Sequence, residues 1–274
     1  MAQFASRNCR AVGSTHVANR LNPLEAVTIF AAGMAAGTIN TIVGSGSLIT
    51  FPTLLLFGYS PLVANVSNTV GLVPGSISGA LGYRRELAGQ RNRAIPLAIA
   101  ALIGGLSGGC LLLVLPAFAF RRIVPILVLL ASLLMALQPW LARALAERRI
   151  VARRRDGEAS LVLVSGVFLT AVYGGYFGAA QSVILIAVLS IFLSDSLQRL
   201  NGLKNALTAV VNLAAAVLFT LTAPIAWPAA LLIAIGSTVG GQLGAVLGRR
   251  LSPLLLRSAI IAVGVVVGVS LLSR

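Results

Sequence analysis

Acidic residues, histidine and cysteine are scarce in this sequence. Its 274 residues include six Asp and Glu, one histidine (His16) and two cysteines, Cys9 and Cys110. The acidic residues all lie in or beside polar segments, so no cluster of carboxylates or imidazoles falls within an apolar run. Zinc and calcium sites need such clusters, and a disulfide framework needs more cysteines. We therefore predict no metal, no cofactor and no disulfide framework.

The shortage of histidine also bears on catalysis. Gly105-Leu-Ser-Gly-Gly109 matches the G-x-S-x-G pattern of serine hydrolases. A serine nucleophile needs a base, usually histidine, and His16 lies in the polar N-terminal tail. We interpret Ser107 as a small packing residue, and we predict that the protein has no catalytic residues and is not an enzyme.

Charged residues are also few, whereas apolar residues dominate. Charged residues make up 10% of the chain, hydrophobic residues 58%, and the mean hydropathy is +0.97. A run of about 20 apolar residues is long enough to cross the hydrocarbon core of a bilayer. We predict an all-α, multi-pass protein of the inner membrane with about eight membrane segments. The apolar runs cover about 24–57, 62–83, 94–115, 123–141, 160–194, 202–222, 226–248 and 253–273.

The excess of basic residues fits a membrane protein better than a nucleic-acid-binding one. The 21 Lys and Arg give a net charge of +15, but no basic stripe is interleaved with aromatic residues. Basic residues in short loops beside membrane segments set topology and contact anionic lipid headgroups. We expect that role here, and no nucleic-acid partner. The arginines between apolar runs include Arg84, Arg85, Arg91, Arg93, Arg148, Arg149, Arg153, Arg154 and Arg155.

The chain divides into two similar halves. We predict a polar tail (1–23), a first membrane repeat (24–141), a charged linker (142–159) and a second membrane repeat (160–274). Each repeat opens with an overlong apolar run that glycines interrupt, and its next run carries asparagines. Internal duplication with glycine-broken segments at equivalent places is typical of secondary transporters and marks their binding sites.

The overlong runs allow two topologies. About 34 helical residues would span some 50 Å, more than one ordinary crossing. Breaking each run at its glycines leaves arms of roughly 11–14 residues, which reach about the midplane. Single crossings would give parallel repeats, and re-entrant hairpins would give inverted ones. The numbers of Lys and Arg do not separate the two arrangements, but the arm lengths favour the hairpins.

Glycines four residues apart recur along the apolar runs. This spacing allows two helices to approach closely in lipid, so we predict a packing role for them. The pairs are Gly33/Gly37, Gly71/Gly75, Gly75/Gly79, Gly104/Gly108, Gly105/Gly109, Gly236/Gly240, Gly240/Gly244, Gly244/Gly248 and Gly264/Gly268.

Polar side chains gather at the two breaks and on the runs that follow them. Hydroxyls, amides and the free N–H groups of helix starts suit a small anion, because such starts carry partial positive charge. The same side chains could instead only satisfy backbone groups freed by the breaks, and we favour the binding role. The predicted substrate-binding residues are Asn40, Ser45, Ser47, Asn68, Thr69, Gln181, Ser182, Lys204 and Asn205.

Lys204 is the only lysine in the chain and lies near the start of an apolar run. A lysine at the centre of a membrane helix costs roughly 2.5–3.5 kcal/mol, which marks it as a functional candidate. Near a helix end it could instead extend to the membrane interface. Asp195 and Arg199 precede it closely, so the sequence leaves both interpretations open.

Several motifs together resemble the TauE/SafE (sulfite exporter) family of permeases. They are the glycine-broken stretch Thr41–Leu55, the second-half stretch Tyr173–Ala179, Asn201-Gly-Leu-Lys-Asn-Ala-Leu207 with Asn212, and Ile235–Ala245. The likeness runs from about residue 24 to 273. It implies about eight membrane segments and transport of small anions, often sulfur-containing oxyanions or organosulfonates. One departure is Gly-Ser-Gly-Ser at residues 44–47, where the family often has a denser glycine run.

We therefore predict a secondary transporter for a small anion, with a sulfur-containing oxyanion or an organosulfonate as the expected class. An anion channel and a structural membrane protein without substrate are the alternatives. Saturation and counterflow separate a carrier from a channel, and a structural protein would carry no flux at all. A homo-oligomer is compatible with the sequence, which does not specify the number of subunits.

Overall fold

The computed structural model describes residues 21–151, 160–247 and 253–272, and every regular element within these ranges is helical. The predicted tail lies largely outside them, as do residues 152–159 of the predicted linker. The helices are α2 (Pro23–Ile42), α3 (Ser47–Leu56), α4 (Pro61–Gly82), α5 (Arg84–Leu87), α6 (Arg91–Val114), α7 (Ala117–Val151), α8 (Leu161–Tyr176), α9 (Gln181–Phe192), α10 (Leu197–Thr222), α11 (Trp227–Leu247) and α12 (Pro253–Leu272).

Four of these helices are long and apolar enough to cross a membrane. They are Arg91–Val114, Ala117–Gln138, Leu197–Thr222 and Trp227–Val246, and four shorter apolar helices accompany them. The all-helical prediction is therefore confirmed for the described residues. One boundary differs, because α7 continues to Val151 and so enters the segment predicted to be a linker. Residues 142–151 are rich in Ala, Leu, Arg and Glu, which favour helix even when charged.

Both overlong runs are broken where glycines interrupt them. The first helix of the first run ends at Ile42 and the next begins at Ser47, and the second run breaks between Tyr176 and Gln181. Gly44 and Gly178 have φ values of 97° and 77°, a backbone conformation that residues with a Cβ rarely adopt. The arms are uneven, at 20 and 10 residues before and after the first break and 16 and 12 around the second.

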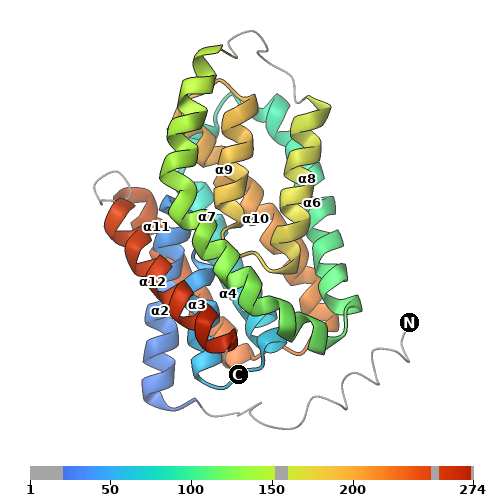
Figure 1. Cartoon of the computed structure of the whole chain (residues 1–274), viewed down its shortest axis with the longest axis vertical. Helices are drawn as coiled ribbons and strands as arrows, with labels where there is room; N and C mark the ends of the chain where they lie inside the picture. Colours follow the sequence, from blue (N-terminus) through green and yellow to red (C-terminus); the bar gives the residue numbers. More distant parts are fainter. Residues whose placement is uncertain (1–20, 152–159, 248–252, 273–274) are drawn as a thin grey trace.

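The two broken runs form hairpins that enter the molecule from opposite ends (Figure 1). α2 starts at the lower end, α3 returns toward it, and α4 then runs to the upper end. α8 starts at the upper end, α9 returns toward it, and α10 runs to the lower end. The hairpin arrangement favoured by the arm lengths is therefore the one present.

Glycines pack helices of one half against helices of the other. Gly33 and Gly37 of α2 face Ile233 and Ser237 of α11, so these two helices run parallel. In the same way, α6 runs parallel to α8, with Gly104 against Ala171 and Gly108 against Val172. The predicted packing role is confirmed at these pairs, whereas Gly248 lies outside the described residues.

Adjacent glycines of α6 provide a test of this packing. A Cβ at Gly108 would lie 2.8 Å from the Tyr176 backbone nitrogen, whereas one at Gly109 would meet side chains only: the end of Leu218 at 3.0 Å and the Phe219 ring at 3.5 Å. We expect Gly108→Ala to destabilise the protein by about 1–3 kcal/mol. Gly109→Ala is the control and should be neutral or slightly stabilising, since alanine favours helix. Thermal unfolding in detergent measures both, and equal melting temperatures for the two variants would contradict the packing.

Candidate functional site

The tips of the two hairpins meet inside the molecule. Gly44, at the first break, lies so close to Ser182 of α9 that a Cβ on Gly44 would overlap the Cβ of Ser182. Ser182 in turn shares a 3.0 Å hydrogen bond with the hydroxyl of Thr208 on α10. The two glycine-broken segments, which are far apart in sequence, therefore contribute to one site.

Two helix starts belong to this site. α3 begins after Gly46 and α9 after Ala180, and neither start has a side-chain cap. The first N–H groups of a helix carry partial positive charge, which favours an anion nearby. Ala180, the residue before α9, adopts a left-handed conformation with a φ of 58°, as does Gly178 two residues earlier with a φ of 77°. The two starts therefore make the hairpin tips electropositive.

One face of α10 lines the hairpin tips with polar groups. Lys204, Thr208 and Asn212 follow one another at four-residue spacing and so lie on one face of the helix. The Lys204 Nζ donates to the Asn40 carbonyl at the end of α2, at 3.5 Å. The next residue, Asn205, donates its amide to the Thr41 carbonyl at 3.3 Å. α10 thereby supports the carbonyl end of α2.

α4 makes the corresponding contact to the other hairpin. Its Asn65 amide donates to the Tyr176 carbonyl, at the end of α8, at 3.0 Å. Further along α4, Asn68 accepts a hydrogen bond from Thr50 of α3. Thr69 instead donates to the carbonyl of Asn65 on its own helix, at 2.9 Å. α4 therefore joins both hairpins.

Ser76 of α4 connects three helices. Its hydroxyl accepts the Asn212 amide of α10 at 2.9 Å and the Asn40 amide of α2 at 3.4 Å. Asn40 therefore uses its carbonyl toward Lys204 and its side chain toward Ser76. Four-residue spacing from Lys204 could have identified Thr208 and Asn212, but no sequence signal singles out Ser76.

Most of the predicted binding residues come together at the hairpin tips. Lys204, Asn68 and Ser182 are buried, and Asn40 and Ser47 are partly exposed. Lys204 is only 1% exposed, so it does not extend to the membrane interface. Thr69 bonds to its own helix, so its hydroxyl is directed to the backbone. Their role in binding remains a prediction.

Several buried polar atoms at the breaks have no hydrogen-bond partner among the described residues. They include the Ser45 hydroxyl, the Gln181 amide nitrogen, the Asn65 amide oxygen and the Tyr176 hydroxyl. Burying an unpaired polar group costs free energy, so native proteins usually pair such groups with protein, water or ligand. A polar ligand at the breaks could form hydrogen bonds with these donors and acceptors.

No carboxylate among the described residues forms an ion pair with Lys204. Among the residues that the structure describes, the ion pairs join Asp195 to Arg93 and to Arg199, beyond the upper ends of α9 and α10. The described residues also hold no cluster of His, Cys, Asp or Glu that could bind a metal. The site thus combines one basic side chain with two helix starts, and no described carboxylate is paired with that side chain.

Aromatic rings hold the second break in place. Phe177 packs edge-to-face on Phe51 of α3 at a centroid distance of 5.3 Å, and Phe120 of α7 packs on Tyr176 at 5.6 Å. The Tyr173 hydroxyl donates to the Ala179 carbonyl at 2.7 Å. The irregular backbone between α8 and α9 is therefore surrounded by protein, as a break at membrane depth requires.

A groove of about 310 Å³ lies between α4 and α10, away from this site. Apolar side chains line it, including Val70, Val73, Leu213 and Leu221. Because Leu213 and Leu221 are exposed on the outer surface, the groove faces the lipid side of the molecule. None of the predicted binding residues lines it.

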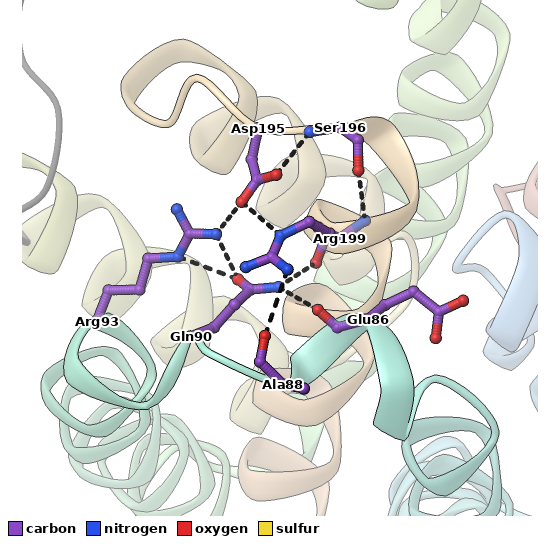
Figure 2. Close-up of polar contacts among 7 residues, drawn as sticks. All are labelled: Glu86, Ala88, Gln90, Arg93, Asp195, Ser196 and Arg199. Carbon is purple, nitrogen blue, oxygen red and sulfur yellow. Dashed lines mark hydrogen bonds and ion pairs between the residues drawn. The ribbon is translucent and has the colours of Figure 1, made fainter.

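A polar cluster joins the loop before α10 to the start of α6 (Figure 2). Asp195 accepts hydrogen bonds from Arg93, from Arg199 at 2.9 Å and from the Ser196 backbone at 2.8 Å. Burial alone would raise the pKa of Asp195, but these hydrogen bonds outweigh it and lower that pKa. Gln90 extends the cluster by donating to the Arg199 carbonyl at 3.2 Å.

Replacing Gly44 tests the contact between the hairpin tips. Gly44→Ala places a Cβ at positive φ and against Ser182, so we expect a loss of stability of about 2–6 kcal/mol from backbone strain and overlap together. Gly58 is a matched control, because its φ is 82° and a Cβ added there would have no atom within 4 Å. Gly58→Ala should show only the strain, about 1–3 kcal/mol. Equal unfolding temperatures would contradict the contact.

The Asp195 cluster predicts a pH dependence of stability. A carboxylate whose pKa is lowered in the folded state stabilises that state above its unfolded pKa of about 3.9, and the effect is lost as the pH falls through the folded value. Asp195→Asn should therefore cost about 1 kcal/mol or less at pH 7. The difference from the unmodified protein should shrink below about pH 4 in thermal unfolding. A difference that grows in acid would contradict this assignment.

Comparisons with known proteins identify a family of membrane transporters. The sequence model of the family described as "Sulfite exporter TauE/SafE" matches residues 29–271. "Probable membrane transporter protein YfcA" of Escherichia coli K12 is 27% identical over 253 residues, covering 92% of this chain and 91% of that protein.

Two further relatives carry similar names. A "Probable membrane transporter protein" of Haemophilus influenzae is 27% identical over 79% of this chain and 82% of its own length. "Probable membrane transporter protein ORF9" of Sinorhizobium sp. is 23% identical over 89% and 91%. No solved structure matches this chain. With its broken helices and the family match over most of its length, the chain belongs to the TauE/SafE family of membrane transporters.

Proposed function

We propose that this membrane transporter is a secondary carrier for a small anion, bound where the two hairpin tips meet. The observation that carries the proposal is the buried Lys204 at the meeting point of the two breaks, whose following helices both start without side-chain caps. Lys204 donates to Asn40 at the first break, Thr208 one turn along α10 bonds to Ser182 at the second, and no carboxylate among the described residues is paired with Lys204. An anion would form an ion pair with the Lys204 side chain and would also satisfy unpaired donors such as the Gln181 amide.

A sulfur-containing oxyanion or an organosulfonate is the proposed substrate class. Tetrahedral sulfur oxyanions present several acceptor oxygens, and the tips present hydroxyl, amide, ammonium and helix N–H donors from several directions. The family description names sulfite export, which agrees with this class. The serines at 45 and 47 add hydroxyls where other family members often have glycine.

For the membrane arrangement we propose six crossing helices and two re-entrant hairpins, which together form the eight expected segments. The hairpins would enter from opposite sides, so the two halves would be inverted repeats. Helical multi-pass proteins of bacteria such as the relatives above belong to the inner membrane, since outer-membrane proteins are β-barrels. Arg84 and Arg85 would lie at the surface and contact anionic headgroups. Assembly into a homo-oligomer stays a prediction.

Carrier transport is favoured over a channel by the closure of the site. Lys204 is 1% exposed, and the Gly44 backbone is in contact with Ser182 across the tips. An anion that reaches this position needs a rearrangement of the hairpins, as alternating access requires. Saturation and counterflow in proteoliposomes would support a carrier, whereas unsaturable flux would favour the channel and absence of flux a structural protein.

Removing Lys204 tests the proposal directly. We expect Lys204→Ala to abolish uptake of sulfite, thiosulfate or methanesulfonate, because the site then lacks the basic side chain that would pair with the anion. The matched control is Arg122→Ala, which removes an exposed positive charge at the start of α7 and should leave uptake within about twofold. Labelled anion uptake into proteoliposomes measures both, and unchanged uptake with Lys204→Ala would exclude the lysine from the site.

Ligand-dependent thermal stability tests the same site without transport. A bound ligand stabilises the folded protein by about RT ln(1 + [L]/Kd), near 2.7 kcal/mol at a hundredfold excess over Kd. We expect a shift with one of the sulfur anions, none with chloride, and none in the Lys204→Ala protein. A shift that survives in Lys204→Ala would place the anion elsewhere.

A further inference from the structure

We propose that Lys204 carries the proton that couples transport, so that one proton and one monoanion cross the membrane together. This inference rests on the proposed function and adds to it the driving force. In the empty site Lys204 is the neutral amine, and it becomes the ammonium when an anion binds beside it.

The first support is the absence of a counter-ion around Lys204. On α10 itself the nearest charge is Arg199, and no described ion pair includes Lys204. The other charged or titratable groups on elements packed against α10 lie at the upper end, are tyrosines or, in one case, are an exposed thiol, and α9 contributes none. They are Tyr83, Arg84, Arg85 and Glu86 around α5, Arg91, Arg93 and Cys110 on α6, and Tyr173 and Tyr176 on α8.

The carboxylates of these neighbouring elements do not compensate the lysine. Glu86 lies beside Gly202, because a Cβ added to Gly202 would be 3.3 Å from the Cβ of Glu86. No described ion pair joins Glu86 to Lys204. Asp195 is already held by two arginines. Glu25 lies at the far end of α2, 15 residues before Asn40, or about 22 Å along the helix. A protonated Lys204 in the empty site is therefore an unbalanced buried charge.

The second support is the poor hydrogen bonding of the ammonium. An ammonium has three donors, yet the described acceptor of Lys204 is the Asn40 carbonyl at 3.5 Å, which is long for such a bond. The two helix starts beside it are also electropositive, so they disfavour a further positive charge. A bound anion removes both penalties at once. Anion binding and protonation therefore promote each other, and this linkage is reciprocal.

The third support is the choice of lysine over arginine. Of the 21 Lys and Arg residues in the chain, Lys204 is the only lysine. Its side chain is buried among the helices. Arginine keeps its proton in proteins, whereas lysine can release it. The positions outside the site thus carry arginine, which stays charged. The site carries lysine, which can gain and lose a proton.

The proton balance follows from this chemistry. On one side of the membrane the Nζ lone pair takes a proton from water as the anion enters, forming an ammonium–anion pair. On the other side the anion leaves, an N–H bond of the ammonium breaks, and the proton passes to water. The loaded and empty sites then carry the same net charge, so the cycle moves no net charge across the membrane.

The test uses the full-length protein in proteoliposomes, a pH-sensitive dye inside and ³⁵S-labelled methanesulfonate as the probe. Methanesulfonate is the anion of a strong acid, so it carries no proton itself. We expect an inward proton gradient of one pH unit to accumulate the label about tenfold, with acidification inside and no effect of a clamped membrane potential. Label uptake without proton movement, or uptake driven by the potential, would overturn the coupling and leave the transport function intact.

Two further outcomes separate the coupling from the transport function. If no label enters with the unmodified protein, the proposed function fails for this anion class and the coupling fails with it. Lys204→Arg keeps the charge but cannot release a proton, so its anion binding should not depend on pH. In weakly buffered detergent solution, methanesulfonate should cause uptake of up to one proton by the unmodified protein and none by Lys204→Arg. If methanesulfonate caused both proteins to take up the same number of protons, the role of Lys204 would be overturned.

Discussion

Backbone groups released where a membrane helix breaks must find partners inside the protein, because lipid offers none. Here two asparagines meet that constraint. Asn65 donates to the Tyr176 carbonyl at the end of α8, and Asn205 donates to the Thr41 carbonyl at the end of α2. Without such donors the last carbonyls of the first hairpin arms would be buried and unpaired. The position of each hairpin therefore depends on the helix that follows the other hairpin.

This arrangement also makes the two halves depend on each other. Asn65 belongs to the first half and supports a hairpin of the second, while Asn205 does the reverse. The glycine contacts also join the two halves, since α2 of the first half packs on α11 of the second, and α8 of the second packs on α6 of the first. Each half thus supplies hydrogen bonds and packing to the hairpin of the other. The candidate site lies between the two hairpin tips. Carbonyl ends are satisfied by protein, whereas the helix starts opposite them are left without side-chain caps.

The features that local sequence patterns predicted are those with a local physical cause. A glycine in a long apolar run marks a break because positive φ is readily available only to glycine, as Gly44 and Gly178 illustrate. Small residues four apart predict close helix contact, because they lie on one face of the helix and have no large side chain to keep the neighbouring helix away. Family resemblance rested on the order of these same motifs. The extension of α7 was missed because a change in charge marks the membrane boundary but does not end a helix.

Partner choice across the halves could not be predicted in the same way. The sequence placed asparagines on α4 and α10, but which carbonyl each one reaches depends on the packing of helices far apart in the chain. Thr69 illustrates the difficulty, since a helical threonine bonds its own backbone as readily as a ligand. Lys204 was ambiguous because sequence position does not measure depth, and only its 1% exposure excludes contact with the membrane interface.

The two ends of the molecule differ in a way that bears on alternating access. Ser60 and Ser196 cap α4 and α10 in equivalent ways, yet the residue before each cap is Tyr59 at the lower end and Asp195 at the upper end. Only Asp195 draws two arginines together, and it thereby ties the second hairpin to α6. In the proposed carrier cycle, opening the upper end would separate these charges, whereas the described residues of the lower end form no ion pair. An inverted architecture would make the two openings similar in shape, and this cluster makes them unequal in energy.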